Sequence, residues 1–367
     1  MKITGIEARS YSLPLDPPFN AAWDSQPRTK FGDTLVIVES DDGVRGYAGG
    51  APAPDVELIR SLLKGVDLED LDRVFNICQS VDFHHGRNWT VEVAVWDLRA
   101  RAAGVPLWQF LGGRFDRFPA YASTGERIDI ADRVERLLAW QEQGVRAAKV
   151  RFNQSDWRED IKVVEAARDA AGSGMELMVD ANHGWRMTGD LRPRWDLATA
   201  RQCARALGDL NVFWLEEPLD TADIEGYAAL RGTSPVRIAA GEMVRSLSET
   251  RRLLDSVDVI QNDVVLAGGV SGCRMVAKWA EDLSRVWSPH TWSTGFGLLA
   301  NLHVALAYSK AEFIEVPFDP PAWTPERRDF MLAQPIEIDS EGNIAVPSGP
   351  GLGDEPDLAA LERYRVA

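Results

Sequence analysis

The chain has 367 residues, a length that fits one α/β barrel together with a smaller domain. Hydrophobic residues make up 45% of the chain and charged residues 26%, which is ordinary for a globular protein. No apolar run approaches the roughly 18 residues that a membrane-spanning helix needs. The net charge of −16 argues against nucleic acid or an anionic membrane as partner, because both attract basic surfaces.

The first residues, MKITGIEARS, alternate like a strand and lack the basic region, apolar stretch and cleavage site of a secretory signal. We therefore expect a cytoplasmic protein. Cys78, Cys203 and Cys273 lie far apart and outside any CxxC pair. This spacing predicts buried, unpaired thiols rather than disulfides or a zinc site.

The N-terminal third has the pattern of an α+β domain. Residues 3–13 and 34–48 read as strands, the second interrupted by an Asp-Asp-Gly turn. Residues 14–33 between them are rich in turn formers and predict a loop. Residues 54–117 are predicted to be helical, with apolar residues at helical spacing before the Gly112-Gly113 stop. We assign residues 1–117 to this domain.

From Phe118 the pattern changes to short apolar runs that alternate with helical stretches, as in repeated βα units of a parallel sheet. Eight runs favour a closed barrel over an open sheet, and the helix after the last run is weak. The fold class is therefore α/β, a modified TIM-type (β/α)7β barrel over residues 118–320, and residues 321–367 form a tail predicted to return to the first domain. The runs are residues 118–125, 146–152, 176–182, 211–218, 236–242, 257–265, 285–291 and 311–317.

Polar residues follow or end these runs, although a buried parallel strand should be apolar throughout. In an α/β barrel the carboxyl ends of all strands open onto one face, so these residues should converge. A single acid after a strand is more often a helix cap, but the repetition over seven of the eight runs favours a shared site. The residues are Lys149, Arg151, Asp180, Asn182, Glu216, Glu217, Glu242, Asp263, His290 and Glu315.

Several carboxylates that converge need compensating positive charge. Asp180, Glu216 and Glu242 offer hard oxygen ligands, and no cysteine or HExxH motif lies near them. This favours Mg²⁺ over zinc, with calcium as the weaker alternative. A bound cation would also offset the negative protein charge for an anionic substrate.

The strand-end strings are, in chain order, KVRF, VDAN, WLEEP, AAGE, QNDVVLAGGVS, SPHT and EVP. Their order and spacing resemble the mandelate racemase and muconate lactonizing branch of the enolase superfamily over nearly the whole chain. The resemblance implies a capping domain, a barrel and a returning tail, usually in a homo-oligomer. It also implies that Asp180, Glu216 and Glu242 bind Mg²⁺, which grips a small-molecule carboxylate while the proton α to it is removed.

The same resemblance implies roles for further residues. His290 would be the general base, oriented by Asp263, and Glu315 would face the substrate carboxylate. Lys149 is assigned to catalysis. Asn182, which strand alternation places on the side of Asp180, is a candidate substrate ligand, as is Trp23 in the capping loop; these complete the predicted site.

Arg151 departs from the family pattern, since many relatives carry a second lysine base at this position of a KxK motif. A guanidinium stays protonated, so it is a poor base but a good anchor for a substrate oxygen. An ion pair between Arg151 and Asp180 or Glu315, without contact to ligand, is the alternative.

With one base, His290, dehydration of an acid sugar to a 2-keto-3-deoxy acid is the leading hypothesis. A lactone cycloisomerase is nearly as compatible, a racemase or epimerase is a further alternative, and a catalytically silent metal-binding barrel is the alternative outside enzymes.

Overall fold

The computed structural model describes residues 1–366. The chain starts with a three-stranded antiparallel sheet in the order β1 (Ile3–Phe19), β2 (Arg28–Ser40) and β3 (Arg45–Ala48). The predicted Asp-Asp-Gly turn joins β2 to β3, and Gly43 at its centre has a φ of 83°, a conformation that costs glycine little.

The long loop predicted at residues 14–33 is largely wrong. β1 continues to Phe19 and β2 begins at Arg28, because the two strands pair from Pro14 with Lys30 to Phe19 with Arg28. A register shift lies between these two pairs, which accommodates the prolines. Only residues 20–27 connect the strands, so the capping loop that carries Trp23 is shorter than the sequence suggests.

Four helices complete this region, as the sequence predicts for residues 54–117. They are α1 (Val56–Leu63), α2 (Leu71–His85), α3 (Trp89–Ala102) and α4 (Leu107–Phe110). Asp55 and Asp70 cap the first two through their side chains. A Cβ on Gly46 of β3 would lie 2.1 Å from the carbonyl oxygen of Ala94, so the glycine lets α3 lie directly on the sheet.

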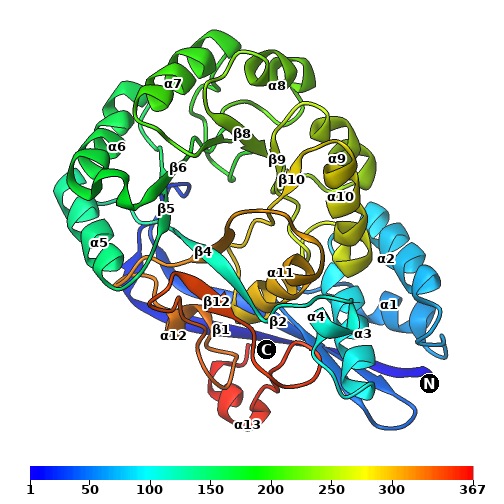
Figure 1. Cartoon of the computed structure of the whole chain (residues 1–367). Coiled ribbons are helices and arrows are strands. Elements are labelled where there is room, and N and C mark those ends of the chain that lie inside the picture. Colours follow the sequence, from blue (N-terminus) through cyan, green and yellow to red (C-terminus); the bar gives the residue numbers. More distant parts are fainter. Residues whose placement is uncertain (367) are drawn as a thin grey trace.

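The rest of the chain forms the predicted ring of parallel strands with helices outside it (Figure 1). Each of the first seven strands is followed by a helix before the next strand, which gives the (β/α)7β order. The strands are β4 (Arg117–Ser123), β5 (Ala147–Arg151), β6 (Glu176–Asp180), β7 (Trp214–Glu216), β8 (Arg237–Ala240), β9 (Val259–Ile260), β10 (Val286–Trp287) and β11 (Ile314–Pro317). The helices are α5 (Ile130–Glu142), α6 (Trp157–Ala171) with the 3-10 turn η1 (Gly172–Gly174), α7 (Leu197–Asp209), α8 (Ile224–Arg231), α9 (Leu247–Leu254), α10 (Gly269–Asp282) and α11 (Gly295–Tyr308).

The seam of the ring lies between β10 and β11. Within the described residues the ladder runs from β10 through β4 to β11, and no backbone ladder joins the two ends. Side chains bridge the seam instead: Ser288 Oγ donates to the Phe313 carbonyl at 3.1 Å, and the Thr291 amide donates to Glu315 Oε2 at 2.7 Å. The fold is α/β and resembles a TIM barrel.

The C-terminal segment contacts both the barrel and the N-terminal region. β12 (Asn343–Ala345) pairs antiparallel with the start of β4. Further along, the Leu352 amide donates to Asp97 of α3, and the Val366 amide donates to the Ser10 carbonyl of β1 at 3.0 Å. The remaining short elements are α12 (Pro325–Arg328), α13 (Leu358–Leu361) and η2 (Glu362–Tyr364). The domain boundaries at residues 117 and 320 stay a prediction.

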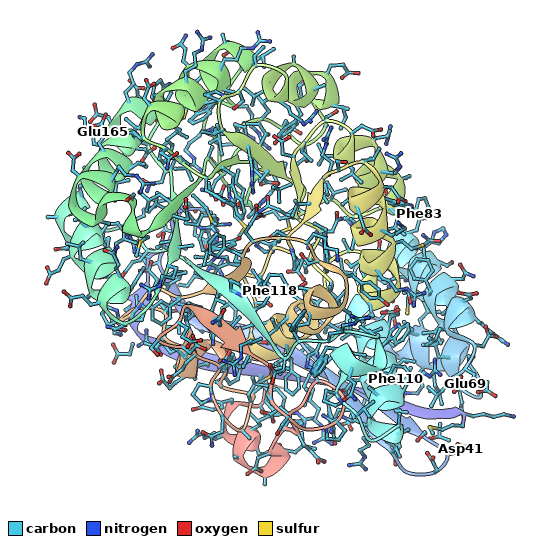
Figure 2. All side chains as sticks on the ribbon, viewed as in Figure 1. Asp41, Glu69, Phe83, Phe110, Phe118 and Glu165 are labelled. Carbon is cyan, nitrogen blue, oxygen red and sulfur yellow. The ribbon has the colours of Figure 1, made fainter. Side chains whose placement is uncertain are left out.

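Side chains fill the interior of the ring and the space between strands and helices (Figure 2). Cys78, Cys203 and Cys273 are buried and unpaired among the described residues, as predicted. Across residues 1–366, no helix combines the length and the apolar character that a membrane span requires.

Candidate metal centre and active site

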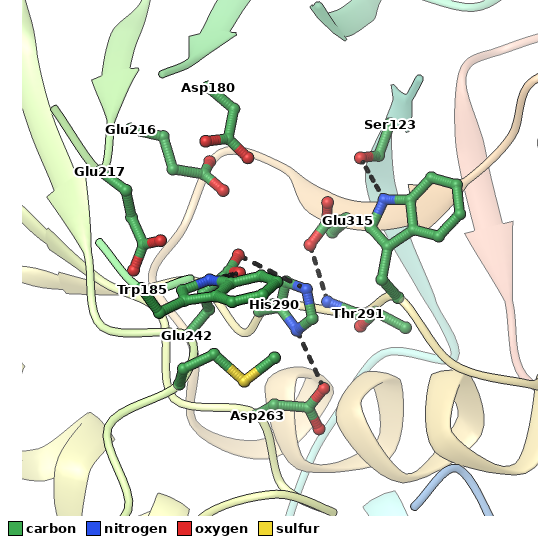
Figure 3. Close-up of polar contacts among 12 residues, drawn as sticks. Ser123, Asp180, Trp185, Glu216, Glu217, Glu242, Asp263, His290, Thr291 and Glu315 are labelled. Atoms are coloured by element: carbon green, nitrogen blue, oxygen red, sulfur yellow. Dashed lines mark hydrogen bonds and ion pairs between the residues drawn. The ribbon is translucent and has the colours of Figure 1, made fainter. Parts of the chain in front are cut away.

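Asp180, Glu216 and Glu242 converge at the carboxyl ends of β6, β7 and β8 (Figure 3). One carboxylate oxygen from each lies within 4.8 Å of the others, and all three residues are buried. Glu242 follows Gly241, whose φ of 108° turns the chain after β8 toward the other two acids. The structure thus brings together the three residues that the sequence selects as metal ligands.

The acids fit a divalent cation. Burial raises the pKa of Glu216 to about 7 and raises the pKa of Asp180, since nearby lysine and arginine only partly offset it. Glu242 Oε2 is buried without a hydrogen-bond partner among the described residues. A Mg²⁺ ion would satisfy this oxygen and the clustered negative charge, and oxygen ligands are those it prefers.

Lys149 lies at the base of this cluster and is completely buried. Its Nζ lies 2.5 Å from Glu216 Oε1 and 2.9 Å from Glu315 Oε1. Burial lowers the pKa of Lys149, but the two glutamates outweigh burial and hold the pKa above its ordinary value. Lys149 is therefore a fixed positive charge in this arrangement.

Arg151 lies beside the triad in an ion pair with Asp180, with 2.5 Å between Nη1 and Oδ2. The same nitrogen donates to Asn182 Oδ1 at 3.0 Å. The guanidinium also lies over two indole rings, 4.6 Å from the centroid of Trp23 and 5.5 Å from that of Trp292. The predicted residues Arg151, Asn182 and Trp23 are thus brought together, and their binding of substrate remains a prediction.

His290 and Asp263 form the predicted dyad, with 3.1 Å between Nδ1 and Oδ2. The other nitrogen, Nε2, faces the metal site and lies 3.5 Å from Glu242 Oε2. Burial lowers the pKa of His290, but Glu242, Glu315 and Asp263 outweigh it and raise the pKa to about 9. A cation bound by the triad would offset part of this negative charge and favour the neutral, basic imidazole.

Asn301 of α11, which sequence reasoning missed, holds this dyad in place. Its Nδ2 donates to Asp263 Oδ1 at 3.0 Å and to the His290 carbonyl at 3.1 Å. Its Oδ1 accepts from the Val264 amide at 2.9 Å. A polar residue inside a largely apolar helix was the available signal, because buried amides need partners.

Glu315 faces the cluster from β11. Burial raises the pKa of Glu315, but Lys149, His290 and Arg151 outweigh it and lower the pKa to about 2. One of its oxygens, Oε2, accepts from the Thr291 amide at 2.7 Å. Glu315 is therefore an ionised group beside the positively charged side chains of Lys149 and Arg151.

Aromatic side chains cover the site. Trp23 and Trp292 meet edge to face with 4.6 Å between ring centroids, and Phe19 stacks on Trp292 at 5.7 Å. Trp185 and Met187 from the loop after β6 pack against the same cluster. From the sequence, Phe19 and Trp23 are expected in a capping loop over the substrate, and Trp23 is the proposed contact. Trp185 and Trp292 are not predicted to join them, because they stand in loops distant along the chain.

The family model described as Enolase C-terminal domain-like matches residues 129–360. A relative from Salmonella typhimurium, L-talarate/galactarate dehydratase, is 30% identical over 83% of this chain and 78% of its own. D-galactarolactone cycloisomerase from Agrobacterium fabrum is 27% identical over 100% of this chain and 99% of its own.

A solved structure of L-talarate dehydratase from Polaromonas sp. JS666, complexed with Mg and L-glucarate, is 27% identical and superposes with a TM-score of 0.85. The alignment covers 100% of this chain and 98% of that one. Sequence relatives and structural neighbours thus include acid sugar dehydratases and cycloisomerases, and neighbours were solved with bound magnesium. The chain belongs to the enolase superfamily, and its relatives there include acid sugar dehydratases, cycloisomerases and a racemase.

Proposed function

We propose that this protein is a Mg²⁺-dependent lyase that dehydrates an acid sugar to a 2-keto-3-deoxy acid. The observation that carries the proposal is an asymmetry of the site. His290, held by Asp263 through Nδ1, presents its other nitrogen, Nε2, toward the metal triad, 3.5 Å from Glu242 Oε2. Lys149 and Arg151 on the other side are held protonated in ion pairs with carboxylates.

One usable base is sufficient for elimination. His290 Nε2 takes the proton from the carbon α to the substrate carboxylate. The protonated imidazole then donates this proton to the β-hydroxyl, whose C–O bond breaks so that water leaves, and the resulting enol becomes the 2-keto acid. When bound, Mg²⁺ supplies positive charge that stabilises the substrate carboxylate as charge develops on it.

The other residues of the site bind and orient. Lys149 and Arg151 add fixed positive charge for the developing anion, which is worth most in a buried site. Asn182 and Trp23 are the proposed contacts to the rest of the substrate. Glu315, held ionised by Lys149, keeps that lysine in place between the triad and β11.

The acid sugar class is supported by the names of the relatives, which act on galactarate and talarate, gluconate and arabinonate. A second candidate, lactone cycloisomerisation, is favoured by the match to D-galactarolactone cycloisomerase over the whole chain. Racemisation is less well supported, because it needs a second base opposite His290 and Arg151 is a poor proton acceptor.

The test is turnover of a panel of aldonates, aldarates and their lactones with Mg²⁺, followed by trapping of 2-keto acids with semicarbazide. Dehydration predicts trapped product, and His290→Asn should lower its rate of formation by about 10²–10⁴-fold while His84→Asn, on the exposed end of α2, should not change it. Ring opening of a lactone without a 2-keto product would favour the cycloisomerase. Lack of any conversion across the panel would favour a silent barrel.

We also propose that the protein is a cytoplasmic homo-oligomer, as the family resemblance implies. Size-exclusion chromatography with light scattering tests the oligomer, and a monomeric mass would contradict it. Fractionation of cells of the source organism tests the location.

A further inference from the structure

Each carboxylate of the triad has one oxygen held by an uncharged N–H donor. The backbone amide of Asn182 donates to Asp180 Oδ1 at 2.8 Å. The indole Nε1 of Trp214 donates to Glu216 Oε2 at 3.1 Å, and the indole Nε1 of Trp185 donates to Glu242 Oε1.

The second oxygen of each acid has a different environment. Asp180 Oδ2 meets Arg151 and Glu216 Oε1 meets Lys149. Glu242 Oε2 is buried and has no hydrogen-bond partner among the described residues. The uncharged donors therefore fix how the carboxylates are turned and leave one oxygen of each toward the charges of the site.

We propose that Trp185 and Trp214 are positioning residues of the magnesium site, which hold Glu242 and Glu216 in the orientation that binds the cation. An indole N–H suits this purpose because it donates one hydrogen bond, accepts none and carries no charge that would compete with the metal. Groups that hydrogen-bond to metal ligands orient them in this way.

The two indoles approach from opposite sides. Trp214 lies two residues before Glu216 on β7, so both side chains point into the barrel, and it packs in the core beneath the site. Trp185 comes from above, from the loop after β6, and lies beside Glu242 (Figure 3).

Hydrogen bonds to the backbone fix the loop at Gly184, the residue before Trp185. The Gly184 carbonyl accepts from the amide of Thr221 at 3.2 Å and from its hydroxyl at 3.1 Å. A Cβ at Gly184 would lie 2.1 Å from Glu217 Cδ, so the chain packs against the second acid of the Glu216-Glu217 pair. Trp185 is therefore anchored to the strand ends that carry the triad.

The inference rests on the magnesium site of the proposed function and not on its reaction. Its test is Mg²⁺ binding to the whole protein without substrate, measured by isothermal titration calorimetry. Trp185→Phe keeps an aromatic side chain and removes the N–H. We expect it to weaken Mg²⁺ binding about tenfold or more, the usual effect of losing such a partner.

Trp195→Phe is the matched control, because Trp195 lies at the end of the same loop and its ring is tilted against that of His183, with 4.7 Å between the centroids, and it donates no hydrogen bond to a triad acid among the described residues. We expect its dissociation constant for Mg²⁺ to stay within about twofold of the unchanged protein, since no metal ligand loses a partner. The Tm of each metal-free variant separates positioning from folding: Trp185→Phe should keep its Tm and lose affinity.

An unchanged Mg²⁺ affinity in Trp185→Phe would overturn the proposal for that residue, whatever the activity. Trp214→Phe tests the second indole in the same way, with binding measured well below its unfolding temperature because Trp214 is a core residue. If the unaltered protein binds Mg²⁺ but converts no acid sugar, the proposed function fails while this inference stands.

Discussion

Nζ of Lys149 lies 2.5 Å from Oε1 of Glu216, and both side chains are completely buried. A lysine in this position offsets part of the negative charge of the triad when no cation is bound. Lys149, at the first position of the KxK motif of relatives, is also a poor candidate for a base, because Glu216 and Glu315 stabilise its protonated form.

Lys149→Met should therefore destabilise the metal-free protein by about 3–5 kcal/mol, the cost of leaving buried charges without their partner. The measurement is denaturant unfolding with and without Mg²⁺, and Mg²⁺ should recover part of the loss. Lys162→Met, which breaks an exposed pair with Glu159, is the control and should change stability by less than about 1 kcal/mol. Equal effects of the two substitutions would contradict the assigned role of Lys149.

Mg²⁺ should stabilise the fold, because it binds an arrangement of acids that the unfolded chain lacks. At a free concentration of 100 times its dissociation constant, the gain is about 2.7 kcal/mol. Calorimetric Tm values should rise with Mg²⁺ in the unaltered protein and in Asp169→Asn, an exposed acid on α6. They should not rise in Asp180→Asn, and a full rise there would place the cation elsewhere.

His290→Asn should lower turnover by about 10²–10⁴-fold, the usual contribution of a general base. Mg²⁺ affinity should change little, because His290 is not a ligand. Calorimetric titration checks the second point and steady-state kinetics the first. A variant that binds Mg²⁺ normally and keeps its full rate would exclude His290 as the base.

Acid lability should depend on His303 of α11, which is fully buried, with Nδ1 accepting from the Trp108 amide at 3.0 Å. Burial lowers the pKa of His303 from 6.5 to about 3, so the folded state resists a proton that the unfolded chain takes up. This stabilisation is complete above pH 6.5 and is lost as the pH falls toward 3, by about 1.4 kcal/mol per pH unit.

In His303→Asn the side-chain amide oxygen can still accept from the Trp108 amide, but no group titrates there. Between pH 7.5 and 5 we therefore expect the free energy of unfolding to fall by about 2 kcal/mol less than in the unaltered protein. Urea unfolding at both pH values measures it. His84→Asn on the surface should follow the unaltered protein, and the same slope in all three proteins would show that His303 does not control the acid transition.

The sequence was sufficient to predict the barrel and the triad, because both follow from local patterns. Asp180, Glu216 and Glu242 each break an apolar run at the same point, and the topology of a barrel converts that regularity into proximity. The length of β1 and β2 was not predictable, since pairing across a register shift overrides the prolines of the segment. The contact of Trp185 with Glu242 was also not predictable from the sequence, because it joins two loops whose contacting residues lie 57 positions apart.

From the sequence, Arg151 can either anchor a substrate oxygen or pair with Asp180 or Glu315; the structure has the ion pair with Asp180. Side-chain packing decides which acid Arg151 pairs with, because the guanidinium lies against Trp23 and Trp292. The order of the strands does not reveal this packing. We expect substrate identity to depend on the same aromatic residues, which makes it the least predictable property of the site.

In the proposed reaction His290 removes an α-proton and water then leaves the substrate. The most direct measurement is NMR of acid sugars incubated with the protein and Mg²⁺ in D₂O. We predict a 2-keto-3-deoxy acid with deuterium at C3, and none with His290→Asn. Recovery of substrate deuterated at C2 without any keto acid would contradict dehydration and indicate a racemase or epimerase instead.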